Sequence, residues 1–134
     1  MPVKTLHTTT AVIEVGTGAA LLCCPSATVA LLVGAPLEAP AALTVARVGG
    51  AGLLALGVAS WLARGDTQSH AARGLVSGML LYNLSTVAIL GAGGIRSQRV
   101  GVALWPAVIL HAAMTLWCTG CLLRKPAQVA ESAK

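Results

Sequence analysis

The chain has 134 residues, of which 56% are hydrophobic and only 10% are charged. A typical soluble domain carries about 25% charged residues, so this composition excludes an ordinary soluble domain. The formal net charge of +5 does not indicate a nucleic-acid partner, because most of the basic residues lie at the ends of apolar runs. We therefore expect the lipid bilayer to be the main partner of this chain.

Four long apolar runs fill most of the sequence. They cover residues 11–33, 41–63, 74–92 and 100–123. A helix rises about 1.5 Å per residue, so about 20 apolar residues span a hydrocarbon core ~30 Å thick. The sequence therefore predicts an all-α, four-helix transmembrane bundle that forms a single integral membrane domain.

Turn-forming residues mark the ends of the predicted helices. Pro25 is expected to kink the first helix, because proline has no backbone N–H to donate. Gly34 is expected to end that helix, and Pro40 to begin the next. The glycine-rich segment 91–94 is predicted to be a flexible loop. The candidate N-caps of the third helix are Asp66, Thr67 and Ser69.

Small residues indicate where helices can approach closely. Gly74 and Gly78 have the small-x-x-x-small spacing of membrane helix contacts. Gly16, Ala20 and Gly50 offer similar small surfaces on the first two predicted helices.

The basic residues predict the orientation of the bundle. The segments expected on one side of the membrane carry Lys4, Arg64, Arg73, Arg124, Lys125 and Lys134. The other side carries Arg96 and Arg99. By the positive-inside rule, the chain is predicted to be a multi-pass protein of the inner (plasma) membrane, N-in/C-in.

Several polar residues fall inside the predicted spans, where burial is costly and a functional role is the default hypothesis. Tyr82, Asn83 and His111 lie near the centres of their helices, and Arg47 is close enough in depth to reach them. These residues are expected to form a buried polar layer. The layer has two interpretations, a hydrogen-bonded clasp between helices and a binding site for a ligand or ion.

Glu14 lies in the first span, displaced from its centre toward the N-terminal side. One interpretation is a salt bridge to Arg64 or Arg73 at the membrane boundary. The other is a membrane carboxylate that binds a proton or a cation.

The fourth span has the pattern His111-x2-Met114-x3-Cys118-x2-Cys121, which places four side chains on one helical face. Imidazole, thioether and thiolate groups are suited to soft metals such as Cu(I). The first span adds the adjacent pair Cys23 and Cys24. The same residues are also ordinary packing groups in a membrane helix, so metal binding and packing both remain open.

The segment from Gly18 to Pro25, with its Cys23-Cys24 pair, resembles the first span of Mer-type mercuric-ion transport proteins. This resemblance implies that Cys23 and Cys24 pass a metal ion inward to Cys118 and Cys121.

Two other segments carry resemblances. The segment Glu14-Val15-Gly16-Thr17 resembles the first helix of small multidrug resistance transporters, which implies a glutamate that exchanges protons for cationic drugs. The segments 81–83 and 105–111 are similar to small uncharacterised bacterial four-helix membrane proteins, a resemblance that implies the fold but no activity.

The sequence contains no carboxylate pair, serine triad or phosphate-binding loop, so we expect no enzymatic activity. We expect transport or binding of a small cation or a soft metal ion through the buried polar and thiol groups, in a homo-oligomer. The alternative is a non-catalytic accessory or assembly subunit of a larger membrane complex. No cofactor is predicted beyond a soft metal ion.

Overall fold

The computed structural model describes residues 3–66, 68–97 and 99–124. Within these ranges the protein is entirely helical, and four of its helices are long and apolar enough to cross a membrane. The helices are α1 (Val3–Cys23), α2 (Pro25–Val33), α3 (Pro40–Ala63), α4 (His70–Arg96) and α5 (Leu104–Leu123). The predicted all-α fold with four membrane-length helices is confirmed, and the short α2 is an addition to it.

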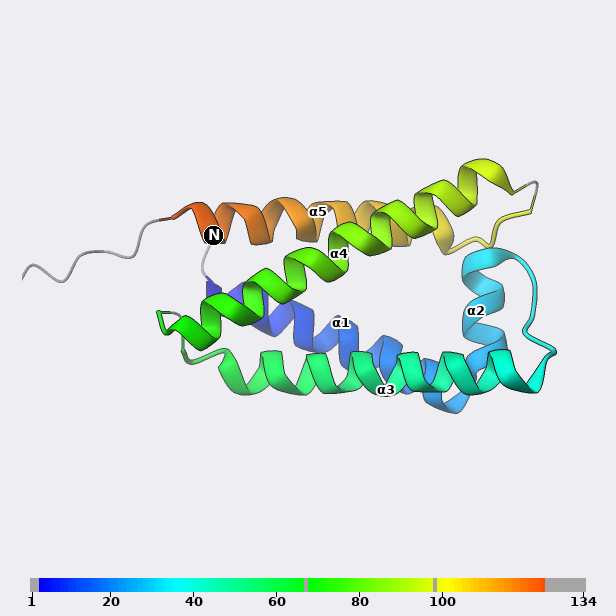
Figure 1. The fold of residues 1–134 in the computed structure, drawn as a ribbon, viewed down its shortest axis with the longest axis horizontal. Helices are drawn as coiled ribbons and strands as arrows, with labels where there is room; N and C mark the ends of the chain where they lie inside the picture. The colour runs from blue at the N-terminus through cyan, green and yellow to red at the C-terminus, as the bar shows by residue number, and fades with distance from the viewer. Residues whose placement is uncertain (1–2, 67, 98, 125–134) are drawn as a thin grey trace, which may run out of the picture.

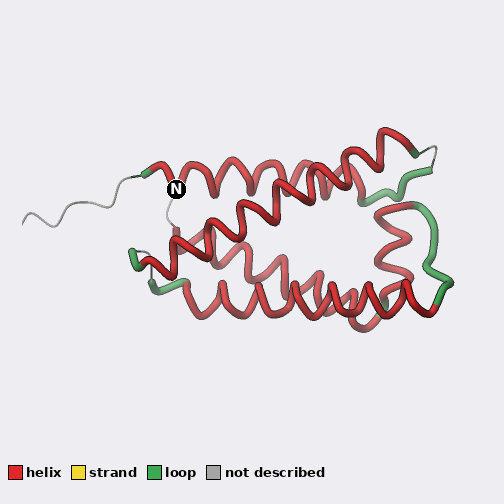
Figure 2. The backbone as a smooth tube through the Cα atoms, viewed as in Figure 1, coloured by secondary structure: helices red, strands yellow, loops and turns green. Residues whose placement is uncertain are grey.

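The long helices form two pairs, because α1 packs most extensively on α3, and α4 on α5 (Figure 1). The start of α1, the end of α3, the start of α4 and the end of α5 lie together, and we call this the terminal end. The opposite end, which holds α2, is called the α2 end. There α2 runs across the direction of the long helices (Figure 2).

The first apolar run is not one helix, so the prediction of a single span over 11–33 is wrong. α1 begins at Val3 and ends at Cys23, and α2 begins at Pro25. Cys24 between them has φ −132° and ψ 57°, outside the helical region. The cause is Pro25, which lacks an N–H and disfavours helical geometry at the residue before it. The expected kink is therefore a complete break.

The residues before α5 hold the C-terminal end of α2 in place. The N–H of Gly101 donates to the carbonyl of Leu32 at 3.0 Å, and the N–H of Ala103 donates to the carbonyl of Leu31 at 2.9 Å. The last carbonyls of a helix have no hydrogen-bond partner within it, so these two bonds satisfy carbonyls that would otherwise be unpaired. They fix α2 to the start of α5.

Three predicted helix ends are confirmed. Gly34 follows the end of α2 with a left-handed φ of 78°, and Pro40 begins α3. Ser69 is the N-cap of α4, where its hydroxyl accepts from the N–H of Ala72 at 3.1 Å. The candidate cap Thr67 lies outside the described residues.

The prediction that residues 91–94 form a flexible loop is wrong, because α4 continues through them to Arg96. Glycine is tolerated in a membrane helix where it lets a neighbour approach closely. Gly94 has this role, since a Cβ atom there would lie 2.7 Å from Leu104 of α5. α4 therefore extends beyond the predicted span 74–92 at both ends, whereas α5 begins four residues later than the predicted 100–123 and ends where predicted.

Glycines bring the backbones of α1 and α3 together. A Cβ atom on Gly18 would lie 2.7 Å from the carbonyl oxygen of Gly50, and one on Gly57 would lie 2.9 Å from the backbone nitrogen of Val15. Such close approach is the expected use of small residues in membrane helix pairs. Gly50 therefore packs as predicted.

Three other glycines behave differently. A Cβ atom added to Gly16, Gly74 or Gly78 meets no atom within 4 Å. The Gly74–Gly78 spacing is thus not used for packing within the described chain, and this face of α4 is open.

The main apolar core joins α1, α4 and α5 in one cluster. Its buried members are Leu6, Val76, Met79, Met114, Cys118 and Cys121. α3 reaches this cluster through Ser60, whose hydroxyl lies 3.9 Å from the sulfur of Met79. Polar groups adjoin the core, and they form the candidate site.

Candidate functional site

A direct hydrogen bond connects α4 and α5 near their middle. Nδ1 of His111 lies 2.7 Å from Oδ1 of Asn83, and Nδ2 of Asn83 donates to the carbonyl of Met79 at 2.7 Å. The second bond orients the Asn83 amide, so its oxygen faces His111. A carbonyl oxygen can only accept, which places the hydrogen on Nδ1 of His111. Nε2 of His111 is therefore the nitrogen left for a proton or another ligand.

Tyr82 and Glu14 join this pair. The ring of Tyr82 meets the ring of His111 edge to face, with centroids 5.6 Å apart. Glu14 of α1 lies within electrostatic range of Tyr82 and is only 4% exposed. We call Glu14, Tyr82, Asn83 and His111 the polar centre. Three predicted layer residues are linked by contacts, and the predicted membrane carboxylate lies within electrostatic range of one of them, Tyr82.

The displacement predicted for Glu14 is wrong. Because α1 runs from Val3 to Cys23, Glu14 lies near the middle of a membrane-length helix. The predicted salt bridges are also absent from the described residues. Arg64 instead donates to the carbonyl of Trp61 and covers its ring, and Arg73 donates to the carbonyl of Leu122 at 3.4 Å. Glu14 therefore has no ion-pair partner in the described part of the chain.

Arg47 does not belong to the polar centre, which corrects the sequence prediction. Its side chain is exposed, and its Nε donates to the carbonyl of Leu22 at 3.4 Å. The break at Cys24 ends α1 next to this part of α3, and a cation is favourable near a helix C-terminus. Arg47 therefore stabilises the interrupted end of α1.

Two polar residues of α1 were missed by sequence reasoning. His7 is 0% exposed and Thr10 is 1% exposed. Spacings of three and four residues place them on the same face of α1 as Glu14. We call His7, Thr10 and Glu14 the polar seam. The spacing was readable, but the first span was expected to begin only at residue 11, which left both residues outside the membrane.

The polar seam contains groups without partners. The two ring nitrogens of His7 have no hydrogen-bond partner among the described residues. The hydroxyl of Thr10 has none there either. Buried polar groups in proteins are nearly always satisfied by protein or by water, so such groups indicate a ligand path or a water site. His7 also lies within electrostatic range of Asp66, an exposed residue that follows α3.

Asp66 is the ionisable group at the surface beside the seam. Its carboxylate accepts from the Ser69 hydroxyl and from the backbone N–H groups of Ser69 and Gln68. These bonds, chiefly the one from the Ser69 side chain, hold the pKa of Asp66 below its ordinary value. Asp66 therefore stays ionised at neutral pH, next to the buried His7.

The candidate metal ligands do not form one site. Met114, Cys118 and Cys121 are buried together in the core, whereas Cys23 and Cys24 are exposed at the break between α1 and α2. Across the described ranges, no three His, Cys, Asp or Glu side chains are close enough to share a metal ion. The two cysteine pairs are not brought together, and metal binding by His111 with the α5 sulfurs stays a prediction.

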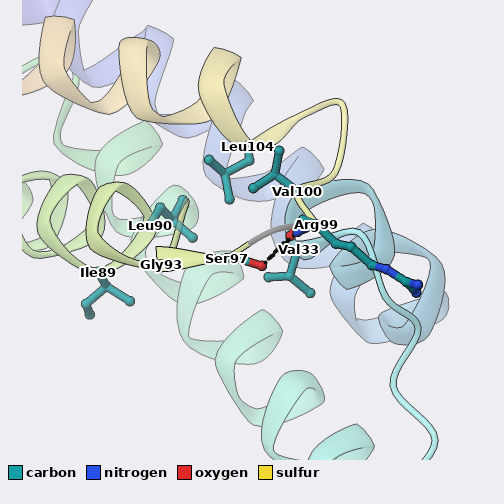
Figure 3. Close-up of a pocket in the computed structure, with 8 residues that line it drawn as sticks. All are labelled: Val33, Ile89, Leu90, Gly93, Ser97, Arg99, Val100 and Leu104. Atoms are coloured by element: carbon teal, nitrogen blue, oxygen red, sulfur yellow. Dashed lines mark hydrogen bonds between the residues drawn. The ribbon is translucent and has the colours of Figure 1, made fainter. Parts of the chain in front are cut away.

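A separate cavity of about 290 Å³ lies at the α2 end, between α2, α4 and the start of α5 (Figure 3). Its lining is almost wholly apolar, apart from Ser97 and Arg99. The Ser97 hydroxyl bonds with the Arg99 backbone, and the Arg99 side chain extends away from Leu90 and Leu104 (Figure 3). This cavity shares no residue with the polar centre.

Comparison of the chain with known proteins does not assign a function to this site. No protein-family model, no curated protein and no solved structure matches the chain. The resemblances of residues 14–17 and 18–25 to transporter helices, and of residues 81–83 and 105–111 to small bacterial membrane proteins, therefore stay predictions. The function has to be argued from the polar centre and the polar seam.

Proposed function

We propose that the protein binds a small cation at the polar centre and, as a homo-oligomer, transports it across the membrane. The observation that carries this proposal is Glu14, a carboxylate that is 4% exposed, lies near the middle of a membrane-length helix and has no ion-pair partner in the described residues. Ionisable residues at such positions usually mark an ion or proton pathway.

The physical reason is the cost of burying charge. An ionised carboxylate in an apolar interior is strongly destabilising unless it is paired. Glu14 is therefore expected to carry a proton or to bind a cation, and exchange between these states is the elementary step of cation transport. The Tyr82 hydroxyl and Nε2 of His111 are the candidates for additional ligands, because Asn83 is already used by two hydrogen bonds.

The small size of the bundle supports an oligomer. The core cluster packs α1, α4 and α5 against one another, so a bundle of this size leaves little room for a continuous pathway within one copy. Copies would associate through the open face of α4, where Gly74 and Gly78 meet nothing in the described chain.

The orientation belongs to the same proposal. Lys4, Arg64, Arg73 and Arg124 lie at the terminal end, whereas Arg96 ends α4 at the opposite end and Arg99 follows it. Lys125 and Lys134 lie outside the described residues. The positive-inside rule then assigns the terminal end to the cytoplasm and the protein to the inner (plasma) membrane.

The test is cation flux in liposomes that contain the purified full chain and a pH-sensitive dye in the lumen. A potassium gradient with valinomycin supplies the driving potential, and the assay is repeated with an imposed sodium gradient. We expect flux with the wild type, loss of flux with Glu14→Gln, and wild-type flux with Glu38→Gln. Glu38 is an exposed glutamate between α2 and α3 and is the matched control.

Two results would contradict the proposal. One is wild-type flux that equals that of protein-free liposomes under both gradients. The other is a Glu14→Gln variant that transports as fast as the wild type, since the flux would then not depend on the buried carboxylate.

The open α4 face also favours a second candidate, an accessory subunit that docks on a larger membrane complex. Gly74 and Gly78 are exposed and meet nothing in the described chain, although their spacing suits close helix contact. Cross-linking from a cysteine placed at Ser77, in a variant with the native cysteines replaced, separates the two. A product of two identical chains supports the homo-oligomer, and a product with an unrelated membrane protein supports the accessory role.

A further inference from the structure

The polar seam contains two buried polar residues, His7 and Thr10, that cation binding at the polar centre does not account for. His7 and Thr10 contribute nothing to the polar centre itself, yet both are almost fully buried, and their polar atoms have no partner among the described residues. Leaving such groups unsatisfied is costly, and a purely structural role would be filled better by apolar side chains. Such unsatisfied groups suit a role that uses polar atoms inside the bundle.

The spacing of the seam suits stepwise proton transfer. His7, Thr10 and Glu14 follow one another at about one helical turn, which is about 5 Å along the axis. Polar groups too far apart for a direct hydrogen bond can be bridged by a water molecule. Imidazole can take up a proton on one nitrogen and release one from the other, and a hydroxyl can accept one proton while donating another.

The seam begins at the surface of the terminal end. Asp66 is exposed and lies within electrostatic range of His7. A carboxylate at this position attracts protons from water to the mouth of the seam. From there the buried groups continue inward through His7 and Thr10 to Glu14.

The α2 side of Glu14 offers no comparable route on this face of α1. The next buried residue is Gly18, where the backbone of α1 lies directly against Gly50 and Leu54 of α3. No side chain fits between these backbones, because even a Cβ atom on Gly18 would lie 2.7 Å from both neighbours. This backbone contact leaves no space for a proton route along this face of α1 on the α2 side of Glu14.

The other ionisable groups around the seam come from three elements. α4 contributes Tyr82, and α5 contributes His111, Cys118 and Cys121, of which Cys118 and Cys121 share the core cluster with Leu6. The segment after α3 contributes Asp66, and α3 itself presents the neutral Ser60 and Leu56 to the core. In the described residues, Asp66 is the group beside His7 that carries a negative charge at neutral pH.

We infer that the cation bound by Glu14 is a proton, and that it reaches Glu14 from the terminal end through His7 and Thr10. This inference rests on the proposed function. In each transfer, one N–H or O–H bond forms as another breaks. The last transfer turns the Glu14 carboxylate into a neutral carboxylic acid, and no other reactant is consumed.

The test measures how fast Glu14 gains a proton. Purified full-length protein in detergent is mixed rapidly with acidic buffer, and the infrared carbonyl band of the protonated carboxyl is followed in time. Loss of the band in Glu14→Gln assigns it. We expect His7→Gln and Thr10→Val each to slow the band's appearance by about a hundredfold, a usual contribution of a positioned proton-transfer group. The final amplitude is expected to stay unchanged.

The matched control is His70→Gln, which removes an exposed histidine at the start of α4 and is expected to react at the wild-type rate. Circular dichroism and gel filtration confirm folding. If His7→Gln does not fold, Thr10→Val decides the question, because it removes only an unpartnered hydroxyl of a similar-sized side chain.

The outcomes separate the two proposals. Wild-type rates in both His7→Gln and Thr10→Val overturn the route but leave cation binding at Glu14 intact. A changed final amplitude with an unchanged rate assigns His7 a structural role and also overturns the route. A wild-type Glu14 band that does not respond to pH overturns both the route and the proton as the bound cation.

Discussion

Nδ1 of His111 lies 2.7 Å from Oδ1 of Asn83, and this hydrogen bond joins α5 to α4 near the middle of both helices. The amide of Asn83 is also tied to its own helix through the carbonyl of Met79. The pair therefore fixes the relative position of the two helices and leaves Nε2 of His111 for a ligand. This geometry fits the clasp interpretation of the polar layer, and the binding-site interpretation stays a prediction for the same two residues.

The clasp can be measured by breaking one side of it. Asn83→Leu leaves the Nδ1–H group of His111 without a partner in the bundle interior. We expect the free energy of unfolding to fall by about 1–3 kcal/mol, the usual cost of such a group. The measurement is reversible unfolding in detergent followed by circular dichroism.

The double variant Asn83→Leu/His111→Leu is the control for this prediction. It removes both polar groups, so it is expected to recover part of the loss. Coupling energies for hydrogen bonds between membrane helices average about 0.6 kcal/mol and reach about 1.7 kcal/mol. Strictly additive effects of the two substitutions would show that the bond contributes nothing to stability.

The glycine contact between α1 and α3 gives a second prediction. Gly18→Ala places a Cβ atom 2.7 Å from the carbonyl of Gly50 and from the backbone nitrogen of Leu54, so the helices have to separate. We expect a loss of about 1–3 kcal/mol in the free energy of unfolding, as for other overpacked positions. Gly16→Ala is the control on the same helix, because its Cβ atom would meet nothing within 4 Å. Equal effects of the two substitutions would argue against the α1–α3 contact.

Much of the fold was predictable because membrane spans depend on length and hydrophobicity alone. Pro40 and Ser69 mark helix starts through local chemistry that a sequence shows directly. The break at Cys24 was not predicted, since proline inside a membrane span is often tolerated, and whether it kinks or breaks the helix depends on neighbouring groups. Here the carbonyls of Leu31 and Leu32 accept hydrogen bonds from the segment before α5, and these bonds stabilise a separate α2.

The candidate site was predicted only in part, and the error has one source. Asn83 and His111 meet, as the predicted polar layer requires, because their helices are uninterrupted. The predicted depth of Glu14 is wrong because the predicted first span, residues 11–33, includes α2 and therefore has its centre too far along the chain. The same span begins after His7, so the predicted site does not include His7. Arg47 was assigned to the interior because its contact, the freed carbonyl of Leu22, exists only once α1 ends at Cys23.

The stability of the terminal end should depend on pH through Asp66. Hydrogen bonds, chiefly from the Ser69 side chain, hold the pKa of Asp66 below its ordinary value. A carboxyl with a lowered pKa in the folded state contributes stability above its unfolded pKa, and this contribution is lost as the pH falls through the folded pKa. We therefore expect the melting temperature of the wild type to fall more steeply than that of Asp66→Asn below about pH 4.

The measurement is thermal unfolding in detergent between about pH 6 and about pH 3, the range over which an ordinary aspartate titrates. Glu38→Gln is the control, since it removes an exposed carboxyl elsewhere and should keep the wild-type slope. Identical slopes for the wild type and Asp66→Asn would show that the Asp66 hydrogen bonds do not persist in solution.

The position of α2 depends on a close backbone contact at Gly101. A Cβ atom there would collide with the carbonyl of Leu31, the same region to which Gly101 and Ala103 donate their hydrogen bonds. Gly101→Ala is therefore expected to release α2 from the start of α5 while leaving the four long helices packed. Hydrogen exchange followed by mass spectrometry should show faster exchange in α2 alone, with α1 and α4 unchanged. Gly93→Ala, whose Cβ atom meets nothing within 4 Å, is the control, and unchanged exchange of α2 in Gly101→Ala would show that other contacts hold α2 in place.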